Sequence, residues 1–117
     1  MGFISEEEIM AVKIVKKKGE TIRKRVSLKY RNGTPVNLSG YRAVSEMRTE
    51  PGGEHITTGL CSVDAAAGII TTTYSASQTA LLQVGETYGF DVWIVGANDK
   101  YCLQTFIVEI TDKYTEA

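Results

Sequence analysis

The chain has 117 residues, of which 43% are apolar and 23% are charged, and its formal net charge at pH 7 is −1. A chain of this size and composition forms one domain with an ordinary hydrophobic core, which excludes a wholly disordered protein. Two cysteines are too few for the disulfide framework of a small secreted domain, and no apolar run approaches the ~20 residues that span a bilayer.

The N-terminal sequence MGFISEEEIM places acidic residues where a signal peptide carries basic ones, so we expect synthesis in the cytosol. Residues 1–8 are predicted to be a flexible arm, because SEEE offers nothing to bury. Residues 9–112 are predicted to form a single domain, and residues 113–117 a polar tail.

The first half of the chain predicts three strands. Residues 9–16 (IMAVKIVK) are apolar and β-branched, as in a strand, and residues 22–30 alternate between apolar and polar side chains, as in a half-buried strand. An Asn-Gly pair at residue 32 then turns the chain, and a proline makes residues 35–38 an edge or a connector. The alternation over residues 41–48 predicts the next strand, in the opposite sheet.

The second half predicts four more strands, with turn residues between them. Residues 56–63 and the β-branched run over residues 69–74 form two of these. Residues 88–94 and 101–111 flank a five-residue connection, which predicts a C-terminal hairpin.

One short segment carries helical signals. Ser75 is a good N-cap, and Gln78 follows three residues later, as in a capping box. The chain is therefore predicted to be all-β, an antiparallel sandwich of about seven strands with one short helix, of about two turns, near residues 75–83.

Residue types that carry chemistry are sparse. The single histidine, His55, lies in a glycine-rich turn, where an exposed loop residue is favoured over a base or a metal ligand. Cys61 and Cys102 are expected to be buried reduced thiols, with a single bridge between them as the alternative. We therefore expect no enzymatic activity, no cofactor and no metal.

Basic residues gather in the first half of the chain, and one interpretation is that they form a face that binds phosphate groups. The stacking aromatics that single-stranded nucleic acid needs are absent from this segment apart from Tyr30, so solvated charges are favoured over nucleic-acid binding. The candidate basic patch comprises Lys16, Lys17, Lys18, Arg23 and Arg25.

Apolar and aromatic residues suggest an interface. The alternation of its strand places Trp93 on the outward-facing side, so Trp93 either marks a contact surface or packs in a second layer. The first strand is able to add to the sheet of a neighbour. The candidate interface residues are Ile9, Val12, Ile14, Trp93 and Tyr101.

Two motifs carry a resemblance. GTPVNLSGY matches the pattern G-x-P-V-x-L-x-G-Y, and AGIITTTYSASQT matches A-G-x-I-x-x-x-x-S-x-x-Q-T. With GETIRKRVSLKY before them and YGFDVWIV and FIVEIT after them, the chain over residues 16–111 is similar to small Ig-like β-sandwich modules of phage and prophage tails. These modules include the N-terminal domain of siphophage upper baseplate proteins.

The resemblance implies an Ig-like sandwich with a non-enzymatic, structural role in a virion, in the tail, the baseplate or the head–tail region. It implies other phage structural proteins and copies of the chain itself as partners, and neither membrane nor nucleic acid. The alternative is a β-sandwich module that binds carbohydrate or a cell surface, since a fold does not determine a function.

Overall fold

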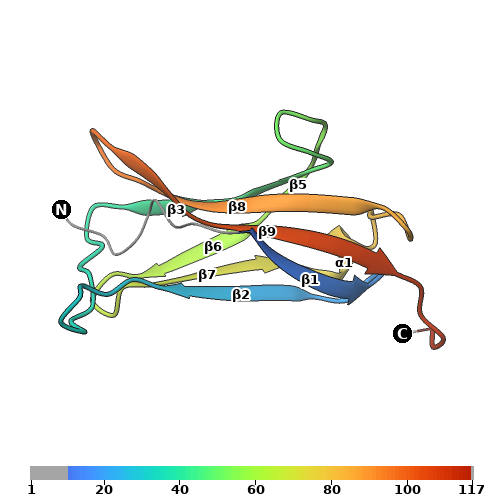
Figure 1. Ribbon diagram of the computed structural model, residues 1–117, viewed down its shortest axis with the longest axis horizontal. Helices are drawn as coiled ribbons and strands as arrows, with labels where there is room; N and C mark the ends of the chain where they lie inside the picture. Colours follow the sequence, from blue (N-terminus) through green and yellow to red (C-terminus); the bar gives the residue numbers. More distant parts are fainter. Residues whose placement is uncertain (1–10, 117) are drawn as a thin grey trace.

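The computed structural model describes residues 11–116, which form two β-sheets packed face to face (Figure 1). The larger sheet has the strand order β1-β9-β8-β4-β5, with β3 also paired to β8, and the smaller sheet has the order β2-β7-β6. The elements are β1 (Ala11–Lys17), β2 (Ile22–Ser27), β3 (Arg42–Val44), β4 (Glu46–Arg48), β5 (His55–Thr58), β6 (Leu60–Asp64), β7 (Ile69–Tyr74), α1 (Ala76–Thr79), β8 (Thr87–Val95) and β9 (Lys100–Thr111).

The predicted all-β sandwich with one short helix is confirmed. The orders β2-β7-β6 and β9-β8-β4 correspond to the two facing sheets of immunoglobulin-type domains. One pairing differs from the antiparallel prediction, because β1 runs parallel to β9 at the edge of the larger sheet. In residues 11–116 no helix is long and apolar enough to cross a membrane.

The core lies between the sheets and is built by the predicted alternation. On β8, Phe90, Val92 and Ile94 point inward and are at most 2% exposed. Phe90 stacks on the ring of Phe106 at a centroid distance of 5.0 Å and contacts the ring of Tyr74 at 4.8 Å. Aromatic pairs at such distances add to the stabilisation that burial alone supplies.

Two predicted strands are interrupted, and at one of the two interruptions the chain changes sheets. The strand expected over residues 56–63 is divided at Gly59 into β5, in the larger sheet, and β6, in the smaller one. Gly59 donates its N–H to the carbonyl of Ser45, which divides β3 from β4. A Cβ at residue 59 would lie 2.9 Å from the ring of Tyr74, so only glycine fits here without displacing a buried side chain.

The helix is shorter than predicted, whereas the proline segment is one of the two forms predicted for it. The capping box of Ser75 and Gln78 is present, but α1 is one turn long rather than two. Residues 35–38 form a connector with a single bridge at Pro35, and two of their side chains, Val36 and Leu38, are fully buried. The N–H of Val36 bonds to Leu28 and that of Leu38 to Ala65, so this connector closes one end of the core.

Gly68 provides a test of this closure. Its φ is +67°, and an added Cβ would lie 2.6 Å from the carbonyl oxygen of Leu28 and 2.8 Å from that of Val36. We expect Gly68→Ala to lower the free energy of unfolding by more than 3 kcal/mol, beyond the ~1–2 kcal/mol of left-handed backbone strain. Gly33→Ala is the matched control, because Gly33 has φ +89° and open space around it. Equal losses in urea denaturation would contradict the steric argument.

Tyr74 provides a second test. Its buried hydroxyl lies 2.7 Å from the hydroxyl of Ser45, so Tyr74→Phe leaves Ser45 unpaired and is expected to cost about 1–2 kcal/mol. Adding Ser45→Ala to Tyr74→Phe is expected to recover part of the loss, because no buried polar group then remains unpaired. A double variant that is less stable than Tyr74→Phe would contradict this pairing.

The same hydroxyl predicts a pH dependence. Burial raises the pKa of Tyr74 well above its ordinary value of 10.0, so the folded state keeps this phenol neutral. The unfolded chain ionises it from about pH 10 upward, which favours unfolding. The difference in free energy of unfolding between the native chain and Tyr74→Phe is therefore complete below pH 10 and declines above it. An advantage that grows from pH 9 to pH 11 in denaturant titrations would contradict the assignment.

Candidate functional site

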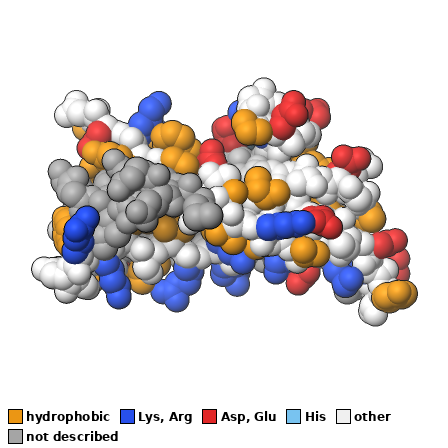
Figure 2. Space-filling view, viewed as in Figure 1, with side chains coloured by type: hydrophobic (Ala, Val, Ile, Leu, Met, Phe, Trp, Pro, Cys, Tyr) orange, Lys and Arg blue, Asp and Glu red, His pale blue; other side chains and the backbone are white. Residues whose placement is uncertain are grey.

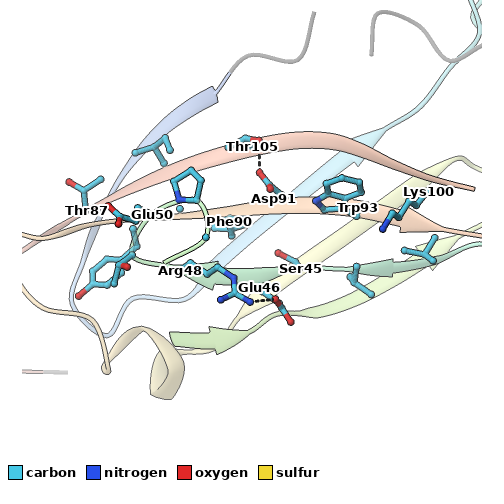
Figure 3. Close-up of a pocket in the computed structure, with 18 of the residues that line it drawn as sticks. Ser45, Glu46, Arg48, Glu50, Thr87, Phe90, Asp91, Trp93, Lys100 and Thr105 are labelled. Carbon is cyan, nitrogen blue, oxygen red and sulfur yellow. Dashed lines mark hydrogen bonds and ion pairs between the residues drawn. The ribbon is translucent and has the colours of Figure 1, made fainter. Parts of the chain in front are cut away.

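A groove of about 730 Å³ lies on the outer face of the larger sheet (Figure 3). Its floor is formed by outward-facing side chains of β3, β4, β8 and β9, and the turn at residues 49–52 forms a wall. This turn belongs to the β4–β5 hairpin, which projects from the sheet in Figure 1. The alternation that sends Phe90 and Val92 into the core sends Asp91 and Trp93 into the groove.

Trp93 lies at the centre of this outer face. It pairs with Val44 of β3 on one side and with Cys102 of β9 on the other, and it is half-buried. Tryptophan is enriched at interfaces, since it offers a large rigid surface together with an N–H donor. Of the two interpretations of Trp93, the structure places the ring in a solvent-open groove rather than under a second layer.

Polar side chains beside Trp93 are held in place by partners of the same chain. Asp91 accepts a hydrogen bond from the hydroxyl of Thr105, its cross-strand neighbour on β9. Arg48 donates from Nη1 to the carbonyl of Gly53 at 3.0 Å and from Nη2 to Glu46 at 2.8 Å. Figure 3 draws the bond between Thr105 and Asp91 and the bond between Arg48 and Glu46. The groove therefore presents an oriented carboxylate and an oriented guanidinium group.

The ionisable side chains that line the groove balance one another. Three are cationic and three are anionic, so their formal charges cancel. A face with no net charge attracts neither a polyanion nor a polycation over a distance. The six side chains are Arg42, Arg48, Lys100, Glu46, Glu50 and Asp91.

The structure does not bring the predicted interface residues together. Val12 is 42% exposed on β1, whereas Ile14 packs against the core. Tyr101 also packs against the core and donates its hydroxyl to Asp99 at 3.2 Å. Trp93 lies in the groove, two strands away from β1, and Ile9 lies outside the described residues. The described members therefore lie in three places: Val12 and Ile14 at a sheet edge, Trp93 in the groove, and Tyr101 near the β8–β9 turn.

Two of the three lysines of the predicted basic patch bond through their side chains to groups of their own chain. Lys16 pairs with Glu20 at 3.5 Å, and Nζ of Lys17 donates to the carbonyl of Asp112 at 3.0 Å. The N–H of Lys17 bonds to Glu20 and lowers the pKa of that carboxyl group. Lys18 follows them, half-buried, at the turn into β2.

The arginines of the patch lie on another surface. Arg23 and Arg25 are exposed on β2, on the outer face of the smaller sheet. Figure 2 shows Lys and Arg side chains along the lower side of the molecule, where β2 lies in Figure 1. The predicted patch is therefore two groups rather than one.

Cys61 and Cys102 are free thiols in the structure, and they lie in different sheets. Both are half-buried rather than buried as predicted, and burial raises the pKa of each thiol. His55 is exposed at the start of β5, with Nε2 2.9 Å from the hydroxyl of Thr58. Within residues 11–116, no group of three His, Cys, Asp or Glu side chains is placed to hold a metal ion.

Most of the groove was missed by sequence reasoning. The outward parity of Trp93 was the available signal, but Arg48, Lys100 and Thr105 carried none. Lys100 and Thr105 lie on β9, the hairpin partner of β8, whereas Arg48 reaches Trp93 only because the distant strand β4 pairs with β8.

Arg48 is expected to order the wall of the groove, because it links β4 to the carbonyl of Gly53. Arg48→Ala is predicted to speed amide hydrogen exchange about three- to tenfold at Gly53 and Glu54, which bond across the hairpin. The matched control is Arg42→Ala, at the far end of the same face. Unchanged exchange in the hairpin of Arg48→Ala would show that the turn is ordered without the bond from Arg48.

No protein-family model and no curated protein matches the chain. The resemblance to phage tail modules therefore rests on the two quoted motifs. In the structure both motifs shape the fold: the first forms the connector with Val36 and Leu38, and the second contains Gly68, β7 and the capping box.

Proposed function

We propose that this chain is a non-enzymatic structural protein of a phage or prophage particle, in the tail, the baseplate or the head–tail region. It acts through contacts with other structural proteins and with copies of itself, and its final location is the virion. The Ig-like strand order agrees with the modules that the sequence resembles. The observation that carries the proposal is the open edge of β1.

Among residues 11–116, strand β1 pairs with another strand on one side only. In the part of the chain that the structure describes, β9 is its single strand partner. Lys18 directs its N–H to the carbonyl of Thr111, so the alternate residues 12, 14 and 16 also direct their backbone groups toward β9. The backbone groups of Lys13 and Val15 point to the open side, where another strand is able to pair. At the end of the strand, the N–H of Lys17 bonds to the carboxylate of Glu20, and its carbonyl accepts from the N–H of Glu20.

The side chains of β1 do not protect this edge. Edge strands are commonly guarded by lysines that keep another strand away. Here Lys13 pairs with Glu109 at 2.9 Å, and Lys16 and Lys17 bond to groups near the strand ends, as described above. Val12 and Val15 remain 42% and 57% exposed, so the edge offers both backbone partners and apolar contact.

The virion role is tested by purifying particles from the strain that encodes the chain and identifying their proteins by mass spectrometry. We expect peptides of this chain in the particle fraction, at a copy number comparable with that of other tail proteins. Their absence from intact particles, with the chain present in the lysate, would contradict the virion role.

The open edge is tested with Val15→Pro, which removes an N–H from the open side without removing a bond to β9. We expect the dissociation constant for self-association, measured by analytical ultracentrifugation, to rise at least tenfold. Val15→Thr is the matched control, because it keeps both the N–H and a β-branched side chain. Melting temperature verifies that both variants fold, and an unchanged constant in folded Val15→Pro would exclude β1 as the contact.

A further inference from the structure

We propose that the groove around Trp93 is a binding site for a neutral saccharide. This site lies on the outer face of the larger sheet, apart from the open edge of β1, and its function goes beyond assembly. The proposal depends on three properties of the groove: an aromatic platform, oriented polar groups and an absence of net charge.

The aromatic platform is Trp93. A pyranose ring has an apolar face of C–H groups, which packs well on an aromatic ring because both surfaces are poorly hydrated. Trp93 is half-buried, its cross-strand partners are Val44 and Cys102, and its side chain lines the groove. Its placement in the middle of the sheet, rather than on a loop, makes this platform rigid.

The oriented polar groups suit hydroxyl ligands. Asp91, two residues before Trp93 on the same face, is held by Thr105, and its carboxylate retains acceptor capacity for ligand hydroxyls. Arg48 uses one N–H group for Gly53 and one for Glu46, so further donors of its guanidinium group remain for the ligand. Groups that are already fixed lose little freedom on binding, which favours affinity.

The balance of charge selects the ligand class. Three cations and three anions line the groove, so a phosphate-rich ligand such as a nucleic acid gains no net attraction from it. A neutral polyol instead uses both kinds of group as hydrogen-bond partners. The volume of about 730 Å³ lies within the ~300–1,000 Å³ that is common for small-molecule sites, so it holds a short oligosaccharide rather than a single small ion.

Intrinsic fluorescence tests the proposal directly, because Trp93 is the single tryptophan of the chain. The neutral probes are oligosaccharides of three to six units, built from glucose, galactose, mannose or N-acetylglucosamine. The charged probes are sialylated and sulfated oligosaccharides. We expect at least one neutral probe to shift the emission of Trp93 saturably and to protect it from acrylamide quenching. Saturable binding of charged probes alone, or of none, would overturn the proposal.

Substitutions locate the site by calorimetry with the neutral probe that binds. Trp93→Ala is expected to weaken binding at least tenfold, and Asp91→Asn, which can still accept from Thr105, about three- to tenfold. Tyr114→Ala is the matched control, since Tyr114 is a fully exposed aromatic outside the groove. Because Trp93→Ala removes half-buried surface, Asp91→Asn keeps the test valid if that variant does not fold.

A polypeptide occupant is a separate outcome of the same measurements. Emission of Trp93 that shifts with protein concentration, together with self-association weakened by Asp91→Asn, would overturn the saccharide site and leave assembly standing. Saccharide binding by a chain that is absent from particles would instead support the groove and contradict the virion role.

Discussion

The structure depends on the contact of three residues where the chain passes from one sheet to the other. Gly59 donates to the carbonyl of Ser45, and the hydroxyl of Ser45 bonds to that of Tyr74 between the sheets. The ring of Tyr74 occupies the space that a Cβ of residue 59 would need. This contact fixes the point at which β5 ends in one sheet and β6 begins in the other.

The crossing determines what the outer face of the larger sheet presents. Since β6 leaves for the smaller sheet, the β4–β5 hairpin stands as a short projection whose turn forms a wall of the groove. The side chain of Gln78 in α1 bonds to the hydroxyl of Thr57 and the carbonyl of Thr58, next to the crossing. The same contacts that organise the core therefore position the groove, whereas the open edge of β1 depends on its pairing with β9 alone.

Local patterns predicted the elements well and their interruptions poorly. The run over residues 69–74 is β7 without a change of bounds, and the capping box at Ser75 formed as predicted, because both depend on neighbouring residues. The break at Gly59 was missed, because the need for glycine there comes from the ring of Tyr74, which contacts residue 59 only in the folded chain. The parallel pairing of β1 was likewise missed, since alternation does not encode strand direction.

The sequence by itself determined the all-β class, the turns, the cap of α1 and the outward parity of Trp93, since each of these follows from side chains a few residues apart. Tertiary structure alone decided that Arg48 shares one groove with Asp91, Trp93 and Lys100. It also decided that the lysines of β1 bond within their own chain and leave Val15 exposed. The physical reason is that strand order, register and the partners of charged side chains are set by pairing between distant segments, which no local pattern specifies.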